Sequence, residues 1–179
     1  MKKLIIYCFV MMLSFTANAQ KEHLRFMGIP ITGTITTFQS KLSGKGIKLD
    51  SRTSANAPVG IRAFTGDFAG YKANIYVYYD KTSKNVYRAK ACIDSNDNEI
   101  FERRYNDLKR MVEAKYSGFY EDVDEQDGHE SITVRTNLGI ISIYTSKYYN
   151  SYPTTYTIHV DYEDRANSNK HLNNKMDDI

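Results

Sequence analysis

The sequence predicts an α+β fold: two approximate α-β-β-β repeats, with two helices packed on one face of a six-stranded antiparallel sheet. Two observations lead to this prediction. Along several short segments, apolar side chains alternate with polar ones, the period of two that a half-buried strand requires. Around 35–42 and 97–116, apolar residues instead recur every three or four positions, which is typical of a helix with one buried face.

The first 19 residues have the three-part layout of a secretory signal peptide. Lys2 and Lys3 give a positive start, the twelve-residue run from Leu4 to Phe15 is almost wholly apolar, and Ala17-Asn18-Ala19 supplies small residues before Gln20. An N-terminal membrane anchor or a buried helix is the alternative, but a bilayer crossing needs roughly 20 apolar residues. We therefore expect a protein exported to the periplasm or the medium.

Cleavage after Ala19 would leave residues 20–179 as the mature chain. The loss of Lys2 and Lys3 lowers the formal net charge of +3 by two, and no basic block remains, so we expect no nucleic-acid partner. Cys92 would be the one remaining cysteine, which excludes an internal disulfide. We expect a single domain over 20–164, with halves of about 20–94 and 95–164, and no transmembrane segment after cleavage.

The first half is predicted to begin with a short helix for which Thr34 is a suitable N-cap. Three of its residues follow at spacings of three and four and would share one buried face: Ile35, Phe38 and Leu42. Gly44 and Gly46 would end this helix, because glycine readily adopts the left-handed geometry found just past a helix end. The polar segment 47–58 predicts a loop, and 61–68 predicts the first strand.

Two strands joined by a polar turn at 80–85 come next. The residues of the first strand that would face inward are Ala73, Ile75, Val77 and Tyr79. Those of the second are Tyr87, Ala89, Ala91 and Ile93. Because the opposite face of both strands is polar, we expect an antiparallel sheet with one side in water.

The second half is predicted to open with the long helix at about 97–116, where Asn96 and Glu99 resemble a capping box. Its buried stripe would consist of Phe101, Tyr105, Leu108 and Val112, with Met111 alongside. We expect an acidic loop at 121–130. The strands that follow are predicted at 131–136, 140–145 and 154–162, the last with Tyr156, Ile158, Val160 and Tyr162 facing inward.

The polar segment 165–179 predicts a frayed or disordered tail.

The third strands of the two halves align as Tyr87-x-Ala89-x-Ala91-x-Ile93-Asp94 against Tyr156-x-Ile158-x-Val160-x-Tyr162-Glu163. A duplication explains this match, and so does the general likeness of any two amphipathic strands; both interpretations stay open.

The Lys2-Lys3 start, the Ala17-Asn18-Ala19-Gln20 junction and the segment Phe26-Met27-Gly28-Ile29-Pro30-Ile31-x-Gly33 resemble uncharacterised exported proteins of Bacteroidota. The tandem helix-plus-strands plan is similar to the β-lactamase-inhibitor-protein architecture and to small envelope-assembly lipoproteins. Those inhibitors carry disulfides and those lipoproteins carry a lipidated cysteine, neither of which this chain offers. The resemblance implies the fold, and no binding residue is carried across from it.

Candidate chemistry is sparse. No two of the four histidines, His23, His129, His159 and His171, have metal-ligand spacing, so we expect no zinc site and no other cofactor. The oxygen-rich segments Asp94-x-Asn96-x-Asn98 and Asp122-x-Asp124 fit a calcium loop poorly, and helix capping or a solvated loop explains them as well. Cys92 with His159 is the one pair suited to a nucleophile and a base, although a lone cysteine is often a packed side chain.

Tyrosine is the strongest compositional signal, with 15 residues and no tryptophan. Tyrosine on a strand can be structural, or it can supply rigid contact area for a partner. The polar faces of the strands predict one open sheet face whose candidate binding residues are Tyr76, Tyr78, Arg88, Lys90, Arg135, Tyr144 and His159, with Thr157 alongside. We expect a non-enzymatic module that binds a protein or envelope component. An envelope structural or assembly factor, or a small cysteine-dependent hydrolase, is the alternative.

Overall fold

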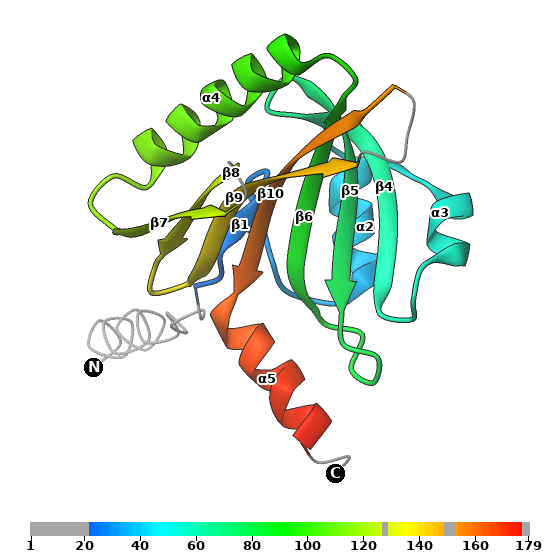
Figure 1. Ribbon diagram of the computed structural model, residues 1–179. Helices are drawn as coiled ribbons and strands as arrows, with labels where there is room; N and C mark the ends of the chain where they lie inside the picture. Colours follow the sequence, from blue (N-terminus) through cyan, green and yellow to red (C-terminus); the bar gives the residue numbers. More distant parts are fainter. Residues whose placement is uncertain (1–21, 127–128, 149–152, 177–179) are drawn as a thin grey trace, which may run out of the picture.

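The computed structural model describes residues 22–126, 129–148 and 153–176, which form an α+β fold around a large antiparallel sheet (Figure 1). The predicted signal peptide, 1–19, lies outside the described residues. In the described part of the chain, the main sheet has eight strands in the order β3-β4-β5-β6-β10-β9-β8-β7. These are β3 (Lys48–Leu49), β4 (Ile61–Phe68), β5 (Tyr71–Tyr79), β6 (Val86–Ser95), β7 (Tyr120–Gln126), β8 (His129–Arg135), β9 (Gly139–Tyr148) and β10 (Thr155–Asp164).

The remaining elements are a small hairpin and the helices. The hairpin pairs β1 (Arg25–Phe26) with β2 (Ile29–Pro30). The helices are α2 (Ile35–Ser43), α3 (Ser51–Asn56), α4 (Asn98–Lys115) and α5 (Arg165–Met176). None of the helices in the described part of the chain has the length and apolar character that a membrane crossing requires.

The sheet consists of two meanders of four strands that meet at β6 and β10. Each meander follows a helix, α2 in the first half and α4 in the second, so the halves repeat each other in topology. β6 and β10 pair antiparallel, with Ala91 opposite Val160. These two residues are also equivalent in the sequence alignment of the two strands.

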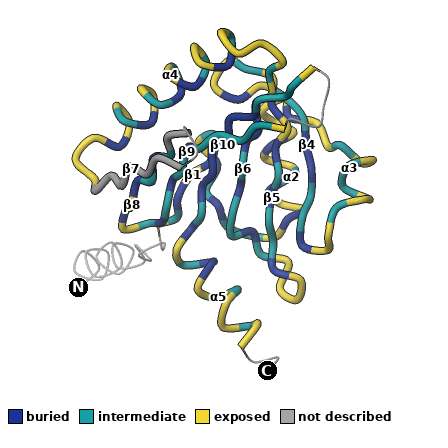
Figure 2. Tube along the Cα trace, in the orientation of Figure 1, coloured by how far each residue is buried: buried dark blue, intermediate teal, exposed yellow. Residues whose placement is uncertain are grey.

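The predicted helices are confirmed, and so are the inward strand faces except at Tyr87. α2 buries Ile35, Phe38 and Leu42, and α4 buries Phe101, Tyr105, Leu108 and Val112. These side chains share one core with the inward residues of the sheet, Ala73, Ile75, Val77, Ala89, Ala91, Ile93, Ile158 and Val160. Figure 2 shows the result as buried positions along the central strands and on one side of α4. Both predicted helices therefore contribute to the core on one face of the sheet.

The predicted helix caps are confirmed in one case and corrected in the other. The Thr34 side chain accepts a hydrogen bond from the Thr37 amide, as predicted for α2. The N-cap of α4 is Asp97 rather than Asn96, because the Asp97 carboxylate accepts from the Ile100 amide at 2.8 Å. An ionised acceptor at this position also interacts favourably with the positive end of the helix dipole.

The loop predictions for two segments are wrong in part, because each segment supplies an edge strand of the sheet. Segment 47–58 contains β3 and α3, and Asp50 caps α3 by accepting from the Thr53 amide. Segment 121–130 is largely β7 and the start of β8, which pair with each other. The six predicted strands are thus present, and two more extend the sheet beyond them.

The alternation predicted that Tyr87 faces inward, and this prediction is wrong. Tyr87 instead lies at a β-bulge. Tyr78 pairs with Arg88 and Tyr79 pairs with Val86, so Tyr87 is left without a partner on β5. A bulge shifts the alternation by one residue. Val86 is therefore fully buried in place of Tyr87, which stays only partly buried.

The prediction of a disordered tail is wrong for residues 165–176, which form α5. The Asp164 carboxylate is fully buried and accepts from the amides of Asn167 and Leu24. The Asn167 side chain, also buried, donates to the carbonyls of Ile31 and Val86. Polar contacts, rather than an apolar stripe, therefore hold α5 against the domain.

Candidate functional site

The predicted polar residues gather on the face of the sheet opposite the core helices, which we call the open face. Its central rows run across β5, β6, β10 and β9 in the observed register. One row contains Asn74, Cys92, His159 and Tyr144, the next contains Tyr76, Lys90 and Asp161, and the third contains Tyr78, Arg88 and Glu163. The structure thus brings both halves of the chain together in one surface.

Each of the three candidate tyrosines of the open face lies against a nitrogen-bearing side chain. The Arg88 Cζ lies 4.8 Å from the ring centroid of Tyr78, and the Lys90 Nζ lies 6.0 Å from that of Tyr76. The rings of Tyr144 and His159 stack, with centroids 4.6 Å apart and planes at 15°. Such contacts hold a ring in place. The three tyrosines nevertheless remain partly exposed, so part of each ring stays available for contact.

Arg88 is anchored beneath this layer by Asp161 on the neighbouring strand. The Arg88 Nε donates to Asp161 Oδ1 at 2.8 Å, and Nη2 donates to Oδ2 of the same carboxylate. Asp161 is buried, with 6% of its surface exposed, while the Arg88 side chain retains 32%. A two-point contact of this kind neutralises a carboxylate that could not otherwise remain charged in a buried position. Arg88 is therefore structural as well as part of the surface.

Cys92 and His159 meet as the sequence suggested, and Ser146 joins them. The Cys92 Sγ lies 3.3 Å from His159 Nδ1, and His159 Nε2 lies 2.7 Å from Ser146 Oγ. Burial raises the pKa of the Cys92 thiol to about 11, although the nearby charge of Lys90 opposes it. Burial and the same lysine lower the pKa of His159 to about 4. At neutral pH the pair is a thiol and a neutral imidazole, which is a hydrogen-bonded contact and not an activated nucleophile.

A groove adjoins this pair at the end of the open face. Its volume is about 580 Å³, and its lining includes Lys48, Lys72, Asn74, Cys92 and Asp94. Asp94 is held there by the Thr157 hydroxyl at 2.6 Å and by the Asn74 amide at 3.2 Å. The groove is polar and contains both charge signs. It extends the open face toward β3 and can accept the edge of a bound partner.

Arg135 lies in the third row of the open face, because Glu163 pairs with Ile140 and Ile140 pairs with Arg135. It is exposed on β8, two strands away from β10, and so marks the far end of the candidate surface. Sequence reasoning missed Asp161 and Ser146 as partners of Arg88 and His159. The charge of Asp161 could have indicated a cation across the sheet, but only the strand register shows which one.

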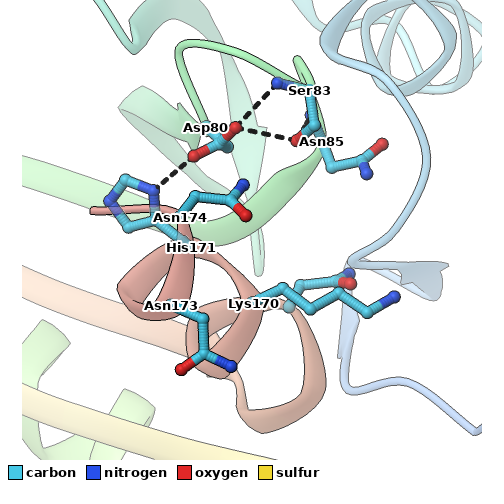
Figure 3. Close-up of a pocket in the computed structure, with 8 residues that line it drawn as sticks. Asp80, Ser83, Asn85, Lys170, His171, Asn173 and Asn174 are labelled. Atoms are coloured by element: carbon cyan, nitrogen blue, oxygen red, sulfur yellow. Dashed lines mark hydrogen bonds and ion pairs between the residues drawn. The ribbon is translucent and has the colours of Figure 1, made fainter. Parts of the chain in front are cut away.

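A second polar site lies between α5 and the β5–β6 turn (Figure 3). The buried Asp80 carboxylate accepts from the Ser83 amide at 2.7 Å, the Ser83 hydroxyl at 2.8 Å and His171 Nδ1 at 2.8 Å. Burial would raise the pKa of Asp80, but these hydrogen bonds and one from Asn174 outweigh it and hold that pKa below its ordinary value. The His171 ring also stacks on Tyr87, with centroids 4.3 Å apart. This site joins α5 to the sheet.

Sequence reasoning missed this second site because it lies on the predicted tail. The signal in the sequence is weak: Asp164, Asn167 and His171 are spaced three and four apart, which places them on one face of a helix. That pattern usually marks apolar burial, and here the residues are polar. Comparison with protein-family models, with known proteins and with solved structures finds no match for this chain, so the chemistry of its own surfaces is the basis for a functional proposal.

Proposed function

We propose that the protein is an exported binding module that contacts a partner protein through the open face. The observation that carries the proposal is the row-by-row pairing of Tyr76 with Lys90, Tyr78 with Arg88, and Tyr144 with His159. These contacts restrain large amphipathic rings before any partner arrives. Less conformational entropy is then lost on binding, which is how a preorganised surface gains affinity.

The charge pattern of the open face favours a protein over a polyanion as the partner. Lys90 lies opposite Asp161, and Arg88 lies between Asp161 and Glu163. Positive and negative groups therefore alternate, whereas a nucleic-acid surface needs uncompensated positive charge. Mixed charge around aromatic residues is typical of a protein interface.

The protonation states of Cys92 and His159 favour contact over catalysis on the same face. A cysteine nucleophile needs a base or a positive charge that stabilises its thiolate. Here burial disfavours both charged forms, and the two side chains share one hydrogen bond. Export to the envelope or medium, which the first 19 residues predict, completes the proposal: the partner would be an envelope or extracellular protein.

Partner capture tests this proposal. The protein is immobilised and exposed to an envelope extract of the cells that produce it, beside a Tyr76→Ser/Tyr78→Ser variant. Arg88 is left in place, because its removal would leave Asp161 buried without its partner. We expect capture of a specific protein to fall at least about tenfold in the double variant, since tyrosines at an interface centre commonly carry more than about 1.4 kcal/mol each.

Phe119→Ser supplies the matched control, because Phe119 is an aromatic residue that is 46% exposed and lies outside the sheet. Capture by this variant should equal that of the wild type, and all three proteins should unfold at similar temperatures. Equal capture by the double variant would assign the partner to another surface.

A further inference from the structure

An apolar groove lies on the helical side of the molecule, away from the open face. It has a volume of about 390 Å³, within the range of about 300–1,000 Å³ typical of small-molecule sites. Apolar side chains from α4, β10, the end of β4 and the β1–β2 turn line it: Met27, Phe68, Leu108, Met111, Val160 and Tyr162. Because its walls come from both halves of the chain, the groove exists only in the assembled domain.

Two methionines make the walls adaptable. Met111 is 51% exposed on α4, although it lies beside the buried stripe of that helix. Met27 faces the groove from the β1–β2 turn and has a left-handed backbone, with φ of 51°. That conformation is uncommon for a large side chain and suits asparagine better at this turn position. Flexible thioether side chains of this kind accommodate apolar ligands of varied shape.

Two lysines, Lys45 and Lys115, also line the groove and give it a positive rim. Both residues are exposed, and neither forms an ion pair with a carboxylate of the described residues. The Lys115 Nζ lies 5.8 Å from the ring centroid of Tyr162. The Lys45 Nζ lies over the β1–β2 turn, only 3.8 Å from where a Cβ on Gly28 would be. Two uncompensated positive charges therefore border an apolar floor.

We propose that this groove binds a free long-chain carboxylate, with the acyl chain on the apolar floor and the carboxylate between Lys45 and Lys115. The charge complementarity selects an anionic head, and the lining selects a hydrocarbon tail. A carboxylate forms ion pairs with the two ammonium groups, whereas an alcohol of the same chain length has no charge to pair with them. This binding site is independent of the open face and of the partner proposed for it.

Calorimetric titration of the purified protein with laurate, kept below its micellar concentration, tests the inference. We expect saturable one-to-one binding, and binding of dodecanol about tenfold weaker, since dodecanol has no charge to pair with the two lysines and tenfold corresponds to about 1.4 kcal/mol. A Lys45→Gln/Lys115→Gln variant should bind laurate about tenfold more weakly and dodecanol as before. Lys41→Gln, which removes an exposed lysine of α2 that does not line the groove, should change neither affinity.

A second variant tests the apolar floor: Met111→Asp should lose both ligands while its far-ultraviolet circular dichroism stays that of the wild type. The proposal is overturned if laurate does not saturate, if laurate and dodecanol bind equally, or if the double lysine variant retains full laurate affinity. Vesicles containing phosphatidylglycerol form a separate arm. Lysine-dependent binding to them without laurate binding would also overturn the proposal, in favour of a membrane surface.

Discussion

Arg88 on β6 and Asp161 on β10 form a two-point ion pair across the seam between the two halves of the chain. The pair lies on the open face, so the same layer that presents the tyrosines also joins the two meanders. Its neighbours on the seam, Cys92 with His159 and Asp94 with Thr157, are also hydrogen-bonded across β6 and β10. The open face is therefore an ordered polar layer and not a loose solvated surface.

Breaking this ion pair should destabilise the domain far more than breaking an exposed one. In Arg88→Met, Asp161 loses its partner while it remains buried, so we expect the free energy of unfolding to fall by about 2–4 kcal/mol, at the lower end of values for buried pairs because Arg88 is partly exposed. Urea unfolding measures this change.

The exposed pair of Lys72 with Asp67 supplies the control, since the Lys72 side chain is 88% exposed and the Asp67 side chain is 64% exposed. Lys72→Met should change the free energy of unfolding by less than about 1 kcal/mol. The double variant Arg88→Met/Asp161→Leu should recover part of the loss, because no buried charge is then left unpaired. Equal losses in Arg88→Met and Lys72→Met would contradict this reading of the seam.

His159 should make stability depend on pH in the weakly acidic range. Its folded pKa of about 4 is below the ordinary 6.5, so the unfolded chain binds a proton first as the pH falls. Stability should therefore be full above about pH 6.5 and should decline toward about pH 4, by roughly 2–3 kcal/mol in all. The titratable and charged groups that face His159 are Lys90, Cys92, Asp94, Tyr144 and Asp161, and the Ser146 hydroxyl lies 2.7 Å from its Nε2.

The pH dependence of the difference between wild type and His159→Gln isolates this contribution, because both proteins carry the same other titrating groups. Urea midpoints measured from pH 8 to pH 4 should converge as the pH falls. A constant difference across this range would show that His159 titrates alike in the folded and unfolded chains.

Cys92 should react slowly with alkylating reagents in the folded protein. Burial raises its thiol pKa from 9.0 to about 11, so the thiolate fraction at pH 8 is about 100-fold lower than in an unfolded chain. Iodoacetamide labelling followed by mass spectrometry should therefore be at least about 100-fold slower in buffer than in urea. Rapid labelling of the folded protein at pH 7 would instead indicate a stabilised thiolate and would favour a cysteine-dependent hydrolase.

Asn167 should stabilise the attachment of α5. Its buried side-chain amide donates to the carbonyls of Ile31 and Val86, and replacement by alanine leaves both acceptors without this donor. We expect Asn167→Ala to lower the free energy of unfolding by about 2–3 kcal/mol. Asn173→Ala is the control on the same helix, because Asn173 is exposed, and it should have little effect. Equal losses of unfolding free energy in Asn167→Ala and Asn173→Ala would contradict the polar anchoring of α5 through Asn167.

The elements that the sequence predicted are those whose burial is apolar and periodic. The α4 stripe and the alternation along 73–79 need no knowledge of the rest of the fold, because each pattern fits only one local structure. The register that brings Tyr76, Arg88 and Asp161 together could not be predicted, since it depends on which strands become neighbours. The sequence did indicate one shared polar face, but not the pairs within it.

The elements that the sequence missed depend on tertiary contacts. α5 has no apolar stripe, because Asp164, Asn167 and His171 are its anchors and all three are polar. β7 is acidic and has low strand propensity, yet it pairs along its length with β8. The bulge at Tyr87 likewise arises from pairing with β5 and has no local signature.

Site-specific photo-crosslinking tests the central claim, that the open face binds a partner protein, most directly. A photoreactive phenylalanine analogue is placed at Tyr76 on the open face, or at Glu102, an exposed position on α4. Both proteins are exported from the cells that make the partner and are irradiated there. We predict one dominant crosslinked protein from position 76 and none from position 102. Crosslinking from 102 alone, or the same products from both positions, would contradict the claim.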